Sequence, residues 1–444
     1  MLLGAIALIV FLLLRLVNLD LIPVFADEAI YIRWAQLIGS DWHNFFIPLS
    51  DGKTPLFMWL LAPLLKFGAD PLLTGRLLSV AAGLGTVIGI YLLTKKLFDR
   101  QTAIWAAGLS VIQPFLVFYD RLSLVDSWLT ALIVWSVYLS LNPSLWLGLF
   151  WAGALLTKPS AGLFIAISAI WPALKRKNWF TLAGAAVLAF AIFNLQRLSS
   201  AFHLIQSRSG DYLQSPHFSF DSLKLFIGWL AAYFSWIGLI VFALTLAWAV
   251  WRRQLKILAL SLLVLVPFMT TLLIGKIVYP RYLLPLVPFM VIIIAWGLRQ
   301  WRHLGLAAAA VLAILWMLPI KLPPAETVQY FESWSAGYGL KEIRNYLRTL
   351  PEGQKVMVAT EGSFGTLPDG LSIYFFGDPK IEIKGVGFPK TTVNQDMETA
   401  LTEGKRVFLV ANWQRYTLTD VDRLKLIAEY PRPTGEKLMF YEVY

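Results

Sequence analysis

Cysteine, histidine and charged side chains are scarce in this sequence. Among its 444 residues there is no cysteine, there are four histidines, and Asp, Glu, Lys and Arg together account for 15%. The lack of cysteine excludes disulfide bonds and thiolate metal sites but does not decide the compartment. Because soluble domains are about one quarter charged, the low charge argues against an ordinary soluble protein.

Apolar and aromatic residues fill the chain instead. Hydrophobic residues make up 58%, with 19 Trp and 29 Phe, and the mean hydropathy is +0.64. This composition predicts a polytopic α-helical membrane protein. The net charge of +11 falls mainly in short loops between apolar runs. It therefore favours contacts with membrane lipids and argues against nucleic acid as a partner.

Apolar runs long enough to cross a bilayer follow one another through residues 1–320. The sequence predicts about eleven spans, at residues 2–18, 73–94, 102–119, 122–141, 145–157, 161–174, 179–196, 223–250, 257–275, 282–298 and 304–320. Two short runs, 145–157 and 161–174, are also compatible with one broken hairpin inside the bundle. The first run lacks a basic flank and an A-x-A cleavage site, so we expect it to remain as a span.

The basic loops predict the orientation of the spans. Most of the loop lysines and arginines lie in four segments, "TKKLFDR", "LKRK", "WRRQLK" and "RQWRH". With an odd number of spans and a cytoplasmic N-terminus, all four lie in the cytoplasm, in agreement with the positive-inside rule. Residues 19–72, 197–222 and 321–444 then lie on the extracytoplasmic side of the cell (inner or plasma) membrane.

Residues 321–444 differ in composition and predict a small α/β domain beyond the transmembrane domain of residues 1–320. Helical spacing appears in "GYGLKEIRNYLRTL", and "KVMVAT" and "RVFLVAN" are typical of buried strands. Residues 367–387 predict turns and further strand, and residues 417–435 a short helix and a turn. The domain shows no Gly-rich phosphate loop, and its simplest interpretation is a lid or structural cap.

Two adjacent acids, Asp27 and Glu28, follow the first span in "PVFADEAIYIRWAQ". On a helix, Asp27 shares a face with Tyr31 and Trp34, which lie four and seven residues further on. A carboxylate at the membrane surface beside aromatic rings can be desolvated and act as a base. The alternative is that both acids only stabilise a helix start, where negative charge is favourable.

A lysine occupies the lipid–water boundary in the same loop. Lys53 precedes an apolar run in "DGKTPLFMWLL", where its ammonium group suits a lipid phosphate. A lysine there can also simply extend its charge toward water and anchor a helix.

Ionisable residues also lie near the outer ends of later spans. Asp126 in "YDRLSLVDSWL" is at membrane depth, which makes it a functional candidate. Arg121 and Arg281 can bind a phosphate through two nitrogens, and Lys158 reaches the same side. Structural ion pairs, Asp120 with Arg121 or Asp126 with Arg281, are the alternative.

A carboxylate, several cations and aromatic rings together suit the transfer of a sugar from a lipid phosphate. The phosphate is the leaving group, so cations stabilise the charge that develops on it. A carboxylate can accept the proton of an incoming hydroxyl group. Negative charge also favours the oxocarbenium-like anomeric centre.

At these residues the chain resembles the multi-spanning C-type glycosyltransferases, in particular the protein O-mannosyltransferase and aminoarabinose-transferase family. The similar stretches are "LLLRLVNLDLIPVFADEAIYIRWA", "GKTPLFMWLLAPLLKFG", "GRLLSVAAGLGTVIGIYLLTKKLF", "PFLVFYDRLSLVDSWLTAL" and "RYLLPLVPF". They occur in the family's order and cover roughly residues 10–300.

The resemblance implies roles for the candidate residues. Asp27, with Glu28 beside it, is the catalytic carboxylate, and Lys53 binds the phosphate of a polyprenyl- or dolichyl-phosphate sugar. The remaining candidates become substrate-binding residues: Tyr31, Arg121, Asp126, Lys158, Arg281 and Tyr282. Aminoarabinose transferases have a metal-binding acid directly before the motif lysine, where this chain has Gly52. We therefore expect no metal and no cofactor.

The sequence thus predicts an inverting membrane glycosyltransferase that acts on an acceptor hydroxyl group of a protein, lipid or glycan. A lipid or solute transporter is the main alternative, although the paired repeats with broken spans typical of transporters are not recognisable. A non-catalytic envelope scaffold is the third hypothesis.

Overall fold

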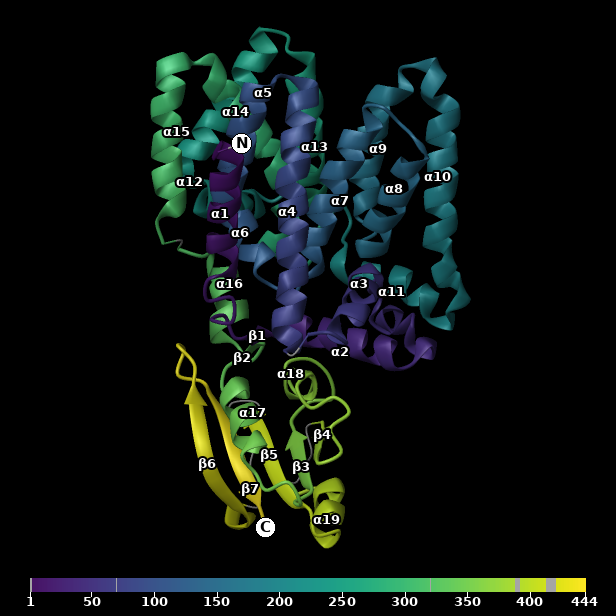
Figure 1. Cartoon of the computed structure of the whole chain (residues 1–444), viewed down its shortest axis with the longest axis vertical. Helices are drawn as coiled ribbons and strands as arrows, with labels where there is room; N and C mark the ends of the chain where they lie inside the picture. The colour runs from purple at the N-terminus through teal and green to yellow at the C-terminus, as the bar shows by residue number, and fades with distance from the viewer. Residues whose placement is uncertain (1, 69, 320, 388–391, 413–420) are drawn as a thin grey trace. The chain divides into compact units, whose positions relative to one another are not determined.

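The computed structural model describes residues 2–68, 70–319, 321–387, 392–412 and 421–444. The chain divides into two compact units, each of which collects segments distant in sequence (Figure 1). The helical unit contains the chain up to Val17, His43–Trp59 and Arg76–Pro323. The mixed unit contains Asn18–Trp42, Leu60–Gly75 and Pro324–Tyr444.

The helical unit is a bundle with an apolar helix at each of the eleven predicted spans. In chain order these helices are α1 (Leu2–Leu16), α4 (Pro71–Leu97), α5 (Arg100–Ile112) with α6 (Pro114–Asp120), α7 (Val125–Ser140), α8 (Leu145–Thr157), α9 (Ala161–Ala173), α10 (Trp179–Asn194), α12 (Phe220–Trp251), α13 (Leu255–Ile274), α14 (Val287–Gln300) and α15 (Arg302–Met317). The mostly helical, multi-span architecture is confirmed.

Fewer than eleven of these helices are long enough to cross a bilayer as straight rods. Among the described residues, five helices meet the length and apolarity that a span requires, or six if the bent pair α5–α6 is counted as one span. The other apolar helices have 10–17 residues, and about 20 residues are needed to cross 30 Å of hydrocarbon. The predicted count of eleven spans therefore stays a prediction.

The predicted span 102–119 is broken by a proline. Pro114 begins α6, and α5 and α6 meet at 56°. Proline cannot continue the hydrogen bonding of a preceding helix. The buried side chain of Gln113 replaces part of it, because its Oε1 accepts bonds from the backbone N–H groups of Phe115 and Leu116 at 2.6 and 3.1 Å.

A second break divides the 32-residue helix α12 at Ser235, whose φ is 59° and ψ 161°. Such a break leaves backbone carbonyls without helical partners. Side chains from elsewhere in the bundle satisfy two of them. Gln113 Nε2 donates to the Tyr233 carbonyl at 3.3 Å, and Trp316 Nε1 donates to the Phe234 carbonyl at 2.9 Å.

Helix α14 lies in the middle of the bundle. Every residue of it from Val287 to Leu298 is buried, as expected for a helix that is apolar on all sides. It packs against α5, α12, α13 and α15, and thereby holds the short segment Pro280–Leu286 that precedes it.

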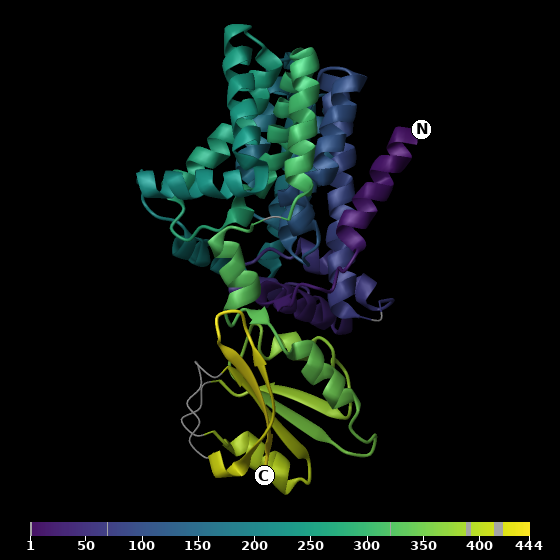
Figure 2. The same cartoon turned by 90° about the vertical axis from the view of Figure 1, so that its left-hand side faces the viewer.

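The mixed unit is built on a five-stranded sheet of order β4-β3-β5-β7-β6 (Figure 2). Its strands are β3 (Val356–Thr360), β4 (Ile381–Gly385), β5 (Arg406–Asn412), β6 (Leu424–Pro431) and β7 (Lys437–Val443). Strand β3 is parallel to β4 and β5, whereas β7 is antiparallel to β5 and β6. Both predicted buried strands, β3 and β5, are confirmed.

Helices cover both faces of this sheet. Helix α17 (Leu340–Arg348), predicted from its spacing, places Tyr346 against Phe408 and Phe440. Helix α19 (Gln395–Thr402) contributes Met397 to a core on the other face, together with Met357.

Two expectations for this region need correction. Where a helix was predicted within residues 417–435, residues Val421–Arg423 form one 3₁₀ turn and Leu424–Pro431 form strand β6, while 417–420 lie outside the described residues. Pairing with β7 over the whole length of β6 overrides the local preference. In 367–387, strand β4 is preceded by the short helix α18 (Asp369–Ser372).

The mixed unit also contains part of the predicted extracytoplasmic loop 19–72. Strand β1 (Val24–Phe25) pairs with β2 (Ala336–Gly337), and helix α2 (Ala26–Ser40) packs against α18. Asp20 forms an ion pair with Lys341, in which the carboxylate oxygen Oδ2 lies 2.6 Å from Nζ. The residues just before α2 are therefore part of the same fold as the C-terminal region. The sequence alone predicts that this segment and the C-terminal region belong to different domains.

Candidate active site

The two adjacent acids occupy the first turn of α2. The buried carboxylate of Glu28 accepts a hydrogen bond from the Phe25 backbone N–H at 3.0 Å and so satisfies a donor at the helix start. Asp27 is half-buried beside it. The helix-start interpretation is therefore supported for Glu28, and Asp27 is the better candidate for chemistry.

The aromatic residues of α2 pack within the mixed unit. Tyr31 and Trp34 are both buried, and their ring centroids are 6.1 Å apart. Trp34 in turn lies 5.9 Å from Phe364. Trp34 therefore helps to fix α2 on the domain, and any contact of Tyr31 with substrate remains a prediction.

Another charged residue of α2 faces a buried acid. Arg33 stacks on Phe376 at 4.8 Å and is electrostatically coupled to Asp369 at the start of α18. Burial raises the pKa of the Asp369 carboxyl, although the Gly365 N–H bond at 2.8 Å and the charge of Arg33 act in the opposite direction. No local pattern indicates this contact, because 336 residues separate Arg33 from Asp369.

Lys53 lies in a tight turn before α3 (Leu56–Leu65). Its Nζ is 3.3 Å from Asp51, and its backbone N–H donates to the Pro48 carbonyl. Gly52 adopts φ +67°, and a Cβ there would lie 2.6 Å from Cβ of Arg208 in α11 (His203–Tyr212). The backbone before Lys53 is therefore held closely by the loop 197–222.

Four predicted residues meet in one cluster of the helical unit, named here the Asp126 cluster: Asp126, Lys158, Arg281 and Tyr282. Asp126 lies in the first turn of α7, and its carboxylate is 2.5 Å from Nζ of Lys158, the residue that follows α8. The Lys158 ammonium lies 5.1 Å from the ring of Tyr282, and Arg281 lies 5.9 Å from the same ring. The structural alternative paired Asp126 with Arg281, whereas the structure pairs Asp126 with Lys158.

The other pair of that structural alternative, Asp120 with Arg121, is likewise replaced. Asp120 binds Arg15 of α1, with Nε to Oδ2 at 2.9 Å and both side chains buried. Arg121 instead donates to the Leu14 carbonyl at 2.8 Å. Gly83 leaves the space for this pair, because a Cβ there would lie 2.2 Å from the Asp120 carboxylate. An arginine inside the first apolar span was a signal for a buried partner that the sequence reading missed.

Residues 52–195 match the sequence model of the dolichyl-phosphate-mannose-protein mannosyltransferases. A curated relative, the undecaprenyl phosphate-alpha-4-amino-4-deoxy-L-arabinose arabinosyl transferase of Pseudomonas aeruginosa (strain UCBPP-PA14), is 28% identical over 318 residues. Part of the chain is thus similar in sequence to membrane glycosyltransferases whose names specify a sugar on a lipid phosphate. The match covers 64% of this chain and 57% of the length of the curated relative.

Solved structures of such glycosyltransferases share the fold. ArnT from Cupriavidus metallidurans bound to undecaprenyl phosphate has a TM-score of 0.63 at 16% identity, over 99% of this chain and 97% of that one. The Archaeoglobus fulgidus oligosaccharyltransferase in complex with Zn and sulfate has a TM-score of 0.52 at 13% identity, over 92% of this chain and 68% of that one. The predicted resemblance is thus confirmed, as is the mostly helical, multi-span fold with a C-terminal β-sheet domain.

The stretch that matches the glycosyltransferase family contains four of the candidate residues, Lys53, Arg121, Asp126 and Lys158. Asp27 and Arg281 lie outside it. In the described part of the chain, no group of three His, Asp or Glu side chains is arranged to hold a metal ion.

Proposed function

We propose that this protein transfers a sugar from a polyprenyl-phosphate donor to an acceptor hydroxyl group on the extracytoplasmic side of the membrane. The match of residues 52–195 to the mannosyltransferase family carries this proposal, because that stretch contains Lys53 and two members of the Asp126 cluster. The names of the relatives supply the donor class, a sugar on a lipid phosphate.

The Asp126 cluster suits a leaving phosphate. Lys158 and Arg281 contribute two cations beside an aromatic ring. Asp126 neutralises one of them and fixes its position, so that Lys158 is held before the donor arrives. As the glycosidic bond breaks, negative charge grows on the phosphate oxygens and fixed cations lower the energy of that state.

Asp27 is proposed as the general base. Its carboxylate accepts the proton of the acceptor hydroxyl group while that oxygen attacks the anomeric carbon. Attack opposite the leaving phosphate inverts the configuration. Lys53 is proposed as a further ligand of the donor phosphate, and Tyr31 and Arg121 as residues near the substrates.

The proposal includes a topology of about eleven spans, with residues 321–444 outside the cytoplasm. It is supported by the apolar helices at all eleven positions and by the four basic loops.

The direct test incubates the purified protein with a labelled polyprenyl-phosphate sugar in lipid vesicles. We expect labelled sugar to leave the lipid and reach an acceptor or water. Movement of the intact donor across the vesicle membrane without cleavage would support the transporter alternative instead.

A further inference from the structure

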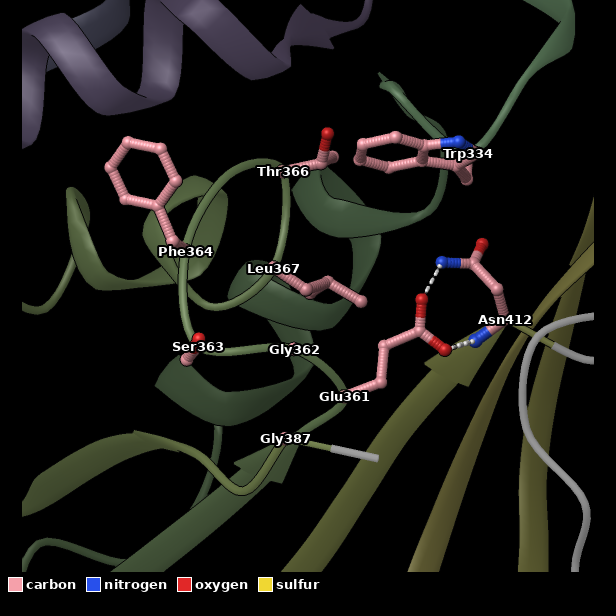
Figure 3. Close-up of a pocket in the computed structure, with 9 residues that line it drawn as sticks. All are labelled: Trp334, Glu361, Gly362, Ser363, Phe364, Thr366, Leu367, Gly387 and Asn412. Atoms are coloured by element: carbon pink, nitrogen blue, oxygen red, sulfur yellow. Dashed lines mark hydrogen bonds between the residues drawn. The ribbon is translucent and has the colours of Figure 1, made fainter. Parts of the chain in front are cut away.

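The mixed unit contains a cavity of about 180 Å³ beside the ends of two parallel strands (Figure 3). Strand β3 leads directly into Glu361, and β5 ends at Asn412; both residues line the cavity. All of its described lining residues belong to this one unit.

The strand order explains why a cavity forms at this place. Adjacent strands β3 and β5 are parallel, but the chain leaves β3 for β4 on one side and leaves β5 for β6 on the other. In sheets with parallel strands, ligands bind outside the carboxyl ends where the connections part in this way.

A buried polar network forms one wall. Glu361 is 2% exposed, and its carboxylate accepts bonds from Asn412 through the backbone N–H at 2.8 Å and through Nδ2 at 2.5 Å. Asn412 Oδ1 accepts a bond from Arg432, which is 4% exposed. Networks of this kind fix the direction of each polar group.

The backbone on the other side is equally fixed. Gly362 and Gly387 exchange two hydrogen bonds, of 2.9 and 3.0 Å, and both have positive φ. A Cβ at Gly385 would lie 2.6 Å from the Gly362 carbonyl oxygen. The glycines therefore let two loops approach closely and shape the cavity with main chain.

Two exposed aromatic side chains complete the lining. Trp334 is 42% exposed and Phe364 46%. Figure 3 shows Trp334 near the Glu361–Asn412 pair and Phe364 on the loop opposite. Phe364 also contacts Trp34 of α2, the helix that carries Asp27.

We propose that this cavity binds an uncharged sugar ring of the acceptor. Carboxylate and amide groups suit hydroxyl groups, which both donate and accept hydrogen bonds. The faces of Trp334 and Phe364 suit the weakly positive C–H groups of a sugar ring. The volume is below the roughly 300–1,000 Å³ of pockets for larger ligands, so a single ring is the expected occupant.

The charges argue against the donor as the ligand. A donor sugar is attached to phosphate, and the Glu361 carboxylate in the wall repels a phosphate group. The charge of the nearby Arg432 is balanced by Glu436, whose carboxylate lies 3.6 Å from it, and one of its nitrogens donates to Asn412. The assignment of this sugar ring to the acceptor rests on the proposed function, whereas the binding of a sugar ring in the cavity does not.

The test measures binding without any transfer reaction. Full-length protein in detergent is mixed with methyl glycosides of mannose, glucose and N-acetylglucosamine at millimolar concentration, and saturation transfer to the sugar protons is recorded by NMR. We expect a signal from at least one glycoside. Trp334→Ala should weaken binding about tenfold, because the stacked ring is lost.

Two further variants make the result specific. Ser363→Trp places a large side chain at an exposed position of the lining and should abolish the signal. Trp42→Ala, the same truncation at a 74% exposed tryptophan outside the cavity, should leave it unchanged.

Absence of signal for all three glycosides, or equal signals in Trp334→Ala, Ser363→Trp and wild type, would overturn the proposal. Displacement of the glycoside by undecaprenyl phosphate would overturn it too, because the site would then belong to the donor. If sugar binding persists in a protein that shows no transfer, only the proposed function fails.

Discussion

At the scale of single residues, Asp27 and Glu28 are adjacent but differ in surroundings. The Glu28 carboxylate is buried and closes the start of α2, whereas Asp27 is half-buried in the same turn. If Asp27 is the base, Asp27→Asn should lower turnover about a hundredfold or more while donor binding persists. Steady-state transfer and donor titration measure the two effects separately.

Two matched variants control for charge and for folding. Asp41→Asn removes an exposed carboxylate at the other end of α2 and should leave turnover unchanged. Glu28→Gln keeps an oxygen that can accept the Phe25 bond, so a loss of less than about tenfold is expected for a residue outside the proton transfer. Wild-type turnover in Asp27→Asn would remove Asp27 from the mechanism.

The two interpretations of Lys53, a ligand of the donor phosphate or a membrane anchor, predict different effects of its removal. Lys53→Ala should raise the apparent KM for the donor about 10- to 100-fold, the usual range for a lost bond to a charged group. Lys66→Ala, at the far end of α3, is the control, because Lys66 is exposed there. An unchanged KM in Lys53→Ala would leave Lys53 as an anchor only.

The Asp126–Lys158 pair is expected to contribute both to the stability of the fold and to sugar transfer. Asp126 is 2% exposed and Lys158 26%, so Lys158→Met leaves a buried carboxylate without its cation and should cost about 3–5 kcal/mol. Adding Asp126→Asn should restore most of the thermal stability. If Lys158 also binds the donor, the stable double variant should still lose transfer; full activity in it would make the pair purely structural.

Which residues are candidates was predictable, but their partners were not. Asp126 was found because an ionisable residue is costly at membrane depth, Arg281 because a guanidinium group can bind a phosphate, and Lys158 because it reaches the same side. The actual pairs, Asp126 with Lys158 and Asp120 with Arg15, depend on which helices are neighbours. A single sequence contains no information on helix order in the bundle.

At the scale of elements, the contact of α2 with α18 predicts a pH dependence of stability. Burial raises the pKa of Asp369, so the folded protein binds this proton more tightly than the unfolded chain. Its contribution to stability is complete below the ordinary Asp pKa of about 4 and is lost as the pH rises through the raised value.

Asp369→Asn should remove this dependence. At pH values below about 4 the variant and the wild type should unfold at the same temperature, because Asp369 is protonated there. At neutral pH the variant should be the more stable. Asp422→Asn, at an exposed position, should follow the wild type at both values. A lower melting temperature of Asp369→Asn at neutral pH would mean that the attraction of Arg33 outweighs burial.

Element type was predictable where one periodicity dominated. Helix α17 and strands β3 and β5 have clear helical or β-branched patterns. Strand β6 is partly exposed along its length, so its sequence carries no buried run, and pairing with β7 decides its structure. The two helix breaks also differ in how far the sequence predicts them. A proline such as Pro114 indicates a break, whereas nothing in the sequence indicates the positive φ of Ser235.

At the scale of the whole molecule, the mixed unit joins residues from both ends of the chain. Asp27, in Asn18–Trp42, therefore belongs to the same compact unit as the proposed sugar cavity. No local pattern predicts this grouping, because it arises from contacts such as β1 with β2 across more than 300 residues. A base and an acceptor site on one folded unit would keep a fixed geometry with respect to each other.

The proposed mechanism requires residues 321–444 to lie outside the cytoplasm, and this can be tested with single cysteines because the chain has none. Glu352→Cys, at an exposed position of the mixed unit, should react in intact cells with a thiol reagent that cannot cross the membrane. Lys177→Cys, exposed in the basic loop "LKRK", should react only after lysis, since that loop is assigned to the cytoplasm. If both cysteines react before lysis, an even number of spans separates them. If only Lys177→Cys does, the whole orientation is reversed and Asp27 lies on the cytoplasmic side, away from an extracytoplasmic acceptor.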